Sequence, residues 1–134
     1  MKKYVIIFFT AILLIVVTYE YEEHYMRIMT GYDYDYFAGH PIISRDNIIV
    51  VEASVCSYSI NKDYILAVRA VEYWRGKETI YTGDMEYIAI NYRTNKVFSF
   101  SSRVAFVDFI HQRGLTTKID FDYWINRIKK RKSC

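Results

Sequence analysis

The sequence predicts an α+β fold, in which an N-terminal signal-anchor helix precedes an antiparallel sheet of four to five strands with two C-terminal helices packed on one face. Three observations predict it. An apolar run opens the chain, segments rich in β-branched residues and separated by turn residues fill its middle, and two stretches with helical apolar spacing close it. Helices that follow a run of strands commonly cover one face of the sheet.

The first segment, residues 1–19, has the composition of an export signal or a signal anchor. Two lysines precede an apolar run from Val5 to Val17, in which Thr10 is the only polar residue. No small-residue cleavage pattern follows, which favours an uncleaved anchor over a cleaved signal. Residues 4–19 would form about 24 Å of helix, slightly shorter than a hydrocarbon core of about 30 Å. Positive charge before the run, with acidic residues after it, orients the N-terminus to the cytoplasm. The following domain is therefore expected on the periplasmic side of the inner membrane, or secreted if cleavage occurs.

Residues 20–30 continue as a juxtamembrane helix, and residues 31–134 form a single domain. The side chains at helical spacing are Tyr21, Tyr25, Ile28 and Met29. They are expected to pack on that domain, with a partner-binding helix as the alternative, and Gly31 is expected to end the helix. The body of the domain is mildly acidic and its C-terminal tail is basic. A body of this charge is a poor nucleic-acid binder, because phosphate binding needs a broad positive face.

The first strand is predicted over Tyr32–Ala38, ended by Gly39-His40-Pro41. A long strand over Asn47–Ile60 is predicted to form a hairpin with Tyr64–Trp74 through a turn at Asn61-Lys62-Asp63.

The stretch Arg75–Asp84 contains two glycines and reads as a loop. A second hairpin is predicted from Met85–Arg93 and Lys96–Ser101, joined by Thr94-Asn95.

Two helices are expected to close the chain. The first begins at a capping serine, Ser101 or Ser102, and runs to about Arg113. Its apolar side should contain Val104, Val107 and Ile110, widened by Phe106 and Phe109. The second begins near Asp120, and its apolar face should contain Phe121, Trp124, Ile125 and Ile128.

Several of these features occur together in one known family. They are the Gly-Tyr-Asp-Tyr segment Gly31–Tyr34, the YIAIN strand Tyr87–Asn91, the Thr94-Asn95-Lys96 turn, and a helix with Phe106 and Phe109 that ends near Gly114. Over roughly residues 31–117 the chain resembles a family of small bacterial exported and lipoprotein-like envelope proteins of unknown function. The resemblance implies location and fold only. The chain departs from that family because no cysteine follows the apolar run.

Alternating tyrosines and aspartates make the first strand a candidate binding face. On a strand, Asp33 and Asp35 share one face about 7 Å apart, and the three tyrosines share the other. An EF-hand loop is excluded, because its glycine and final glutamate positions are Ala38 and Ser44. An ordinary half-exposed strand is the simplest interpretation, a protein-binding face the next, and a carboxylate-based active site the third. The candidate binding residues are Tyr32, Asp33, Tyr34, Asp35 and Tyr36.

Other chemical patterns are weak. The three histidines lack the spacing of a zinc site, and no cofactor motif is present. A serine–histidine–aspartate set around Asp108 and His111 lacks a nucleophile elbow. Cys56 in an apolar strand favours a buried core thiol. A disulfide to Cys134 stays open, since an oxidising compartment permits it, and a catalytic thiol is the least favoured reading.

The C-terminal cations have three interpretations: a solvated helix end, a contact with anionic lipid headgroups, or nucleic-acid binding. The first is simplest, and the second follows from an anchored domain near the membrane. The candidate membrane-surface residues are Arg127, Lys129, Lys130, Arg131 and Lys132.

The sequence as a whole favours a non-enzymatic envelope protein with a protein partner. One concrete version is an immunity or exclusion protein that neutralises a toxin or bacteriocin in the periplasm. The alternatives are a small envelope hydrolase that uses carboxylates, and a structural envelope component without a specific ligand.

Overall fold

A computed structural model describes residues 2–134, and the side chains of residues 6–18 and 24–134. Helix α1 spans Lys2–Thr30 and opens the chain, while helices α2 (Arg103–Gln112) and α3 (Phe121–Lys129) close it. Between them lie the strands β1 (Asp33–Phe37), β2 (His40–Arg45), β3 (Ile48–Val51), β4 (Val55–Asn61), β5 (Tyr64–Arg75), β6 (Glu78–Asn91) and β7 (Lys96–Phe100).

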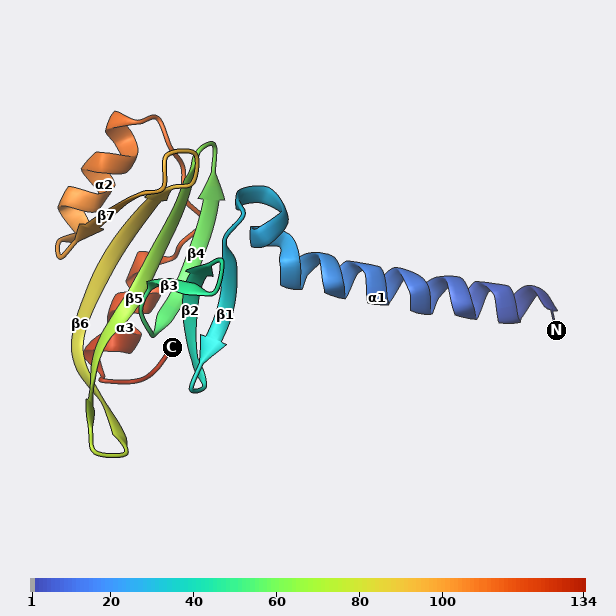
Figure 1. Cartoon of the computed structure of the whole chain (residues 1–134), viewed down its shortest axis with the longest axis horizontal. Coiled ribbons are helices and arrows are strands. Elements are labelled where there is room, and N and C mark those ends of the chain that lie inside the picture. Colours follow the sequence, from blue (N-terminus) through green and yellow to red (C-terminus); the bar gives the residue numbers. More distant parts are fainter. Residues whose placement is uncertain (1) are drawn as a thin grey trace.

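The strands form two antiparallel sheets rather than one (Figure 1). The first has the order β1-β2-β3 and the second the order β4-β5-β6-β7. The α+β class and the two C-terminal helices are as predicted. The prediction of a single sheet of four to five strands is wrong, because the chain changes sheet between β3 and β4.

The four-stranded sheet is the central layer, with a hydrophobic cluster on each face. Side chains of Leu66 and Val68 point to the helices, where Phe106 and Phe109 of α2 and Phe121 of α3 cover them. The alternate residues of β5, Ile65 and Ala67, point the other way and pack against the three-stranded sheet. Because strand side chains alternate between faces, this continuous apolar run is buried on both sides.

The predicted strand Asn47–Ile60 is two strands in different sheets. Ile48–Val51 pairs with β2, whereas Val55–Asn61 pairs with β5. The segment Glu52–Ser54 between them crosses from one sheet to the other. Glu52, Ala53 and Ser54 interrupt the β-branched residues, but no glycine, proline or asparagine marks a turn there, so the segment was predicted as part of one continuous strand.

Two segments that were predicted to lie outside the strands belong to strands in the structure. The stretch Arg75–Asp84, predicted as a loop, belongs mostly to β6, which forms a long hairpin with β5. Gly76 has φ of 65° in the turn of that hairpin, and Gly83 has φ of 91° beside a register shift. His40 and Pro41, predicted as a break, begin β2. Pro41 is tolerated there because it lies at the start of the strand.

The end of α1 is tied to the domain. Met26 and Thr30 are buried, and the Thr30 hydroxyl donates to the Met26 carbonyl oxygen and accepts from the backbone N–H of Tyr32. Gly31 ends the helix with φ of 76°, as predicted. Ile28 and Met29, predicted to pack on the domain, are exposed instead, and the side chain of Tyr21, part of the same prediction, lies outside the described residues.

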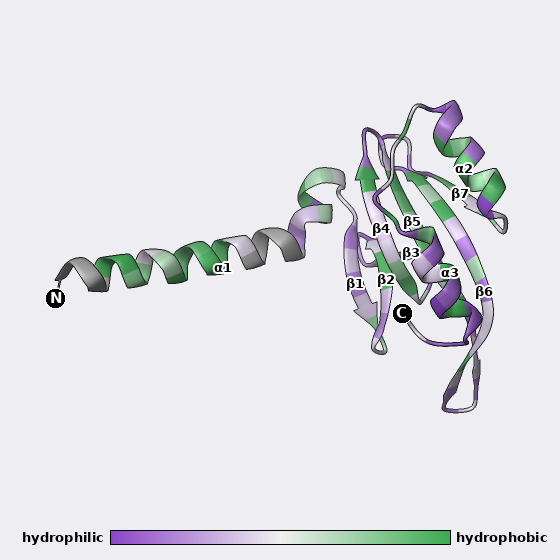
Figure 2. Ribbon diagram, turned by 180° about the vertical axis from the view of Figure 1, so that it is seen from behind, coloured by the Kyte–Doolittle hydropathy of each residue, from purple (hydrophilic) through white to green (hydrophobic). Residues whose placement is uncertain are grey.

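The rest of α1 extends away from the domain, and apolar residues dominate it (Figures 1 and 2). Within the described residues, no helix meets the length and hydropathy that a membrane crossing requires. The predicted anchor includes residues 1–5 and 19, whose side chains lie outside the described part of the chain.

The C-terminal helices begin where the sequence places them. Ser102 is the N-cap residue of α2, and the Asp120 side chain caps α3 by accepting from the Tyr123 N–H at 2.9 Å. The apolar face of α2 differs from the prediction, since Val104 is 69% exposed while Phe106 is fully buried. The helix is therefore rotated so that its aromatic residues, not its first valine, fill the core.

Candidate binding groove

The tyrosines and aspartates of β1 point to opposite faces, as predicted, but the tyrosines mostly stabilise the fold. Tyr32 is buried, and its hydroxyl donates to Asn95 Oδ1 at 3.0 Å. The half-buried Tyr34 donates to the Val55 carbonyl oxygen at 3.2 Å. Burial, with smaller contributions from Tyr36 and Tyr58, raises the pKa of Tyr34 to about 12. These two side chains join the β1 segment to its neighbours, and the hydroxyl of each is already hydrogen-bonded within the domain.

The remaining residues of the predicted binding face have local partners. Asp33 lies 3.5 Å from the Arg27 guanidinium, which links β1 to the end of α1. Asp35 accepts a hydrogen bond from the Tyr36 backbone N–H at 2.7 Å. Tyr36 and Asp35 are exposed. Their role in binding stays a prediction.

The basic residues predicted at the membrane surface lie at the end of α3. The Arg127 guanidinium donates to the backbone carbonyl oxygens of Ser133 and Cys134, and the other four cations are exposed. Figure 1 shows that α3 ends on the side of the domain away from α1. A lipid contact at these cations would therefore require the domain to turn relative to α1.

Cys56 and Cys134 form a disulfide bond. The favoured prediction of a buried core thiol at Cys56 is wrong, and the disulfide alternative is the observed state. The bond holds the C-terminal segment against the start of β4. Ser133 and Cys134 thereby line a cavity of about 390 Å³ together with Tyr34, His40, Ser54 and Tyr81.

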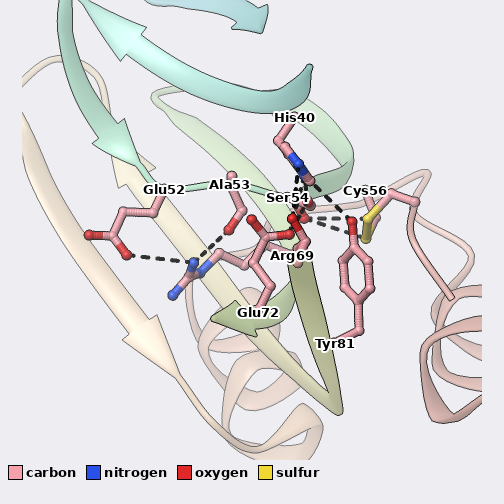
Figure 3. Close-up of polar contacts among 10 residues, drawn as sticks. His40, Glu52, Ala53, Ser54, Cys56, Arg69, Glu72 and Tyr81 are labelled. Atoms are coloured by element: carbon pink, nitrogen blue, oxygen red, sulfur yellow. Dashed lines mark hydrogen bonds and ion pairs between the residues drawn. A yellow bond between two sulfur atoms is a disulfide. The ribbon is translucent and has the colours of Figure 1, made fainter. Parts of the chain in front are cut away.

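His40, Ser54 and Glu72 form a buried polar cluster beside this cavity (Figure 3). The Ser54 hydroxyl donates to Glu72 Oε2 at 2.6 Å, and His40 Nδ1 lies 3.1 Å from the Ser54 hydroxyl and 3.3 Å from Glu72 Oε2. Residues from β2, from the crossing segment and from β5 thus meet at one point. The proximity of these three side chains was not predicted from the sequence.

The cluster does not have the geometry of a catalytic triad. A triad serine gives its proton to histidine, whereas the Ser54 proton points to the carboxylate. Ser54 is also only 1% exposed, and its hydroxyl is already engaged by Glu72 and His40. The cluster joins the first sheet to β5, which is a structural role.

Arg69 of β5 lies beside a second set of cavities, one of which Glu72 also lines. Three cavities of about 330, 280 and 490 Å³ share Arg69 as a lining residue. We call them together the Arg69 groove. The first reaches Trp74 and Phe37, the second lies between β3 and β7, and the third reaches Asp84 and Ser101.

The floor of the groove is an ionic network. Arg69 donates through Nε to Glu86 Oε2 and through Nη1 to the Ala53 carbonyl oxygen at 2.9 Å, and it lies 3.8 Å from Glu52 (Figure 3 shows Glu52, Ala53 and Arg69). Ser99 donates to the other oxygen of Glu86. Burial alone would raise the pKa of Glu86, but the hydrogen bonds from Ser99 and Arg69 and the charge of Arg69 together lower it.

The lining of the groove has more acids than bases, inside an apolar rim. One arginine faces four acids, namely Glu52, Glu72, Asp84 and Glu86. Large apolar side chains at its edges are exposed: Phe37, Ile49, Trp74 and Val97. A concave, acidic floor with an apolar rim is suited to bind a basic segment of another protein.

Within the described residues, no three side chains of histidine, cysteine, aspartate and glutamate gather closely enough to hold a metal ion. His24 and His111 are exposed, apart from the cluster around His40.

No protein-family model, no curated protein and no solved structure matches this chain. The resemblance to small envelope proteins therefore stays a prediction, and the function must be argued from the site itself.

Proposed function

We propose that this chain is a non-enzymatic protein-binding domain, held by residues 4–19 on the periplasmic side of the bacterial inner membrane, and that it binds a basic protein partner in the Arg69 groove. The composition of the groove carries the proposal. Its floor has an excess of carboxylates, and its rim has the exposed apolar side chains that partners commonly bury at interfaces.

The envelope location is supported by α1. Its apolar side chains from Ile6 to Val17 are largely exposed, and the helix leads away from the domain (Figure 1). Exposed apolar side chains of this kind are stable only when another apolar phase or surface covers them. The disulfide is consistent with an oxidising compartment.

The partner that we propose is a toxin or bacteriocin that the domain neutralises, which makes the chain an immunity or exclusion protein. A small, rigid domain with an acidic groove could cover a basic surface of such a toxin. A hydrolase is less well supported, because the Ser54 hydroxyl already donates to Glu72 and Asp33 is paired with Arg27.

Site-specific photo-crosslinking in living cells tests this proposal. A photoreactive phenylalanine analogue at Val97, on the groove rim, is compared with the same analogue at Val104, which is exposed on α2. We expect one discrete adduct with a basic protein from Val97 only, lost when Glu52→Lys reverses a groove charge. An adduct from both positions, or from neither, would contradict the assignment. Protection of cells by co-expression with the captured protein then tests the immunity role.

A further inference from the structure

We propose that the Trp74 end of the Arg69 groove is a binding site for the ammonium group of a lysine side chain on the partner protein. This inference rests on the proposed function and makes it more specific. It concerns the cavity of about 330 Å³ whose lining includes Phe37, Ile49, Glu52, Arg69, Glu72 and Trp74.

The first argument is an unused acceptor. The Glu72 side chain lines this cavity and is only 4% exposed. Its Oε2 atom accepts from Ser54 and lies beside His40, but its Oε1 atom is buried and has no hydrogen-bond partner among the described residues. Buried carboxylate oxygens are normally paired, because desolvation without a hydrogen bond is costly. A donor from outside the chain would supply the missing bond.

The second argument is the pair of aromatic rings at the cavity mouth. Trp74 and Phe37 are 54% and 60% exposed. The His40 ring packs edge-to-face against Trp74, with centroids 5.6 Å apart, and so holds Trp74 at the site. A cation near the face of such a ring is attracted to its π electrons, most strongly for tryptophan.

The carboxylate of Glu52 is only loosely paired with Arg69, so its negative charge is available to an incoming cation. Arg69 is already bound by Glu86 and by the Ala53 carbonyl oxygen, and its distance of 3.8 Å to Glu52 is a loose ion pair. The Glu52 side chain is 84% exposed. An incoming cation therefore meets Glu52 at the surface and Glu72 at depth.

The same geometry selects lysine over arginine. A guanidinium binds a carboxylate best through two parallel hydrogen bonds, but only one oxygen of Glu72 is free because Oε2 is occupied. An ammonium is a compact charge that needs a single acceptor. The long methylene stem of lysine can also lie along the apolar side chains of Phe37 and Ile49. Oε1 is buried in the free chain, so binding of the ammonium requires side chains of the cavity lining to change rotamer.

Nuclear magnetic resonance of the full chain in detergent micelles tests the site directly. The indole N–H signal of Trp74 is followed while N-acetyl-lysine methylamide is added, with N-acetyl-norleucine and N-acetyl-arginine methylamides as matched probes. We expect a saturable shift with the lysine probe, none with norleucine and a weaker one with arginine. The indole of Trp124, which belongs to α3 and packs against the hydrophobic core, serves as the internal control. Equal shifts with norleucine or with arginine would overturn the inference.

Variants then identify the carboxylate. Glu72→Gln keeps the shape of the side chain and should lower the affinity for the lysine probe by at least about tenfold, as expected for loss of a charge-assisted hydrogen bond. Asp84→Asn, at the far end of the groove, should leave its affinity within about twofold. If Glu72→Gln unfolds the domain, the affinity for the lysine probe is measured instead in Glu52→Gln and Trp74→Ala, which change exposed residues. Unchanged affinity in both variants would overturn the inference.

The two proposals can fail separately. If the lysine probe does not bind while the Val97 adduct still forms, the ammonium site is wrong and the groove remains the interface. If the probe binds while no adduct forms from Val97, the ammonium site stands and the protein-binding function is wrong.

Discussion

Cys134 is disulfide-bonded to Cys56 of β4 across 78 positions of sequence. The bond fixes the C-terminal segment beside the cluster of His40, Ser54 and Glu72, so it belongs to the framework of the domain. A crosslink over a loop of this length stabilises a fold mainly by restricting the unfolded chain.

The double variant Cys56→Ser/Cys134→Ser should therefore be less stable by about 4 kcal/mol. Urea unfolding of wild type and variant, each with and without a reducing agent, measures the difference. Reductant should lower the wild-type midpoint and leave the variant unchanged. Equal midpoints for all four samples would show that the disulfide contributes nothing to stability.

The Arg69–Glu86 ion pair predicts a pH dependence. The pKa of Glu86 is lowered in the folded state, so its contribution to stability is present above its unfolded pKa of about 4.5 and is lost as the pH falls through the folded value. Glu86→Gln should be less stable than wild type at neutral pH and should approach it in acid. Chemical unfolding at a series of pH values checks this result, with the exposed Glu78→Gln as control. Parallel profiles for wild type and Glu86→Gln would contradict it.

The raised pKa of Tyr34 predicts a second pH dependence of stability, at high pH. Its pKa is raised to about 12, so its stabilising contribution is full below the unfolded pKa of 10.0 and declines as the pH rises from there to the folded value. Absorbance titration of tyrosinate should show one late-ionising group that Tyr34→Phe removes. The exposed Tyr73→Phe is the matched control. A titration in which Tyr34→Phe removes an ordinary tyrosine would be inconsistent with burial of this hydroxyl.

The orientation of α2 can be tested by two truncations. Phe106 is fully buried under α2, and Phe106→Ala should cost about 3–5 kcal/mol of unfolding free energy. Val104 is exposed, and Val104→Ala should change stability by less than about 0.5 kcal/mol. Denaturant unfolding measures both. A larger loss at Val104 than at Phe106 would mean that the helix packs as the valine spacing suggested.

The local elements were predictable because short-range chemistry determines them. In the turn at Thr94-Asn95, Asn95 is a residue that tolerates positive φ and adopts φ of 59°, while Lys62 adopts φ of 43° in the turn at Asn61-Lys62-Asp63. Asp120 starts α3 for a local reason, because its side chain accepts from the Tyr123 N–H, whereas Ser102 is the N-cap residue of α2 without a side-chain hydrogen bond. In contrast, the crossing at Glu52–Ser54 depends on which sheet offers the better packing, and no turn residue marks it in the sequence.

The candidate groove could not be predicted from the sequence, because it too depends on how distant segments pack together. It combines residues from both sheets, and nothing in the spacing of Glu52, Arg69 and Glu86 places them together. One signal was present: Arg69 and Glu86 are charged residues whose neighbours in the sequence are apolar on both sides. Such charges are rarely buried without partners, so each could have been expected to meet an opposite charge.

The central claim is that the Arg69 groove, rather than the exposed part of β1 or the basic tail, is the surface that binds a basic partner. Chemical-shift mapping of the full chain in micelles, titrated with a peptide of alternating lysine and leucine, tests it most directly. The perturbed backbone amides should cluster at Glu52, Arg69 and Val97. Perturbations centred on Tyr36 or on the end of α3, with these three unchanged, would contradict it.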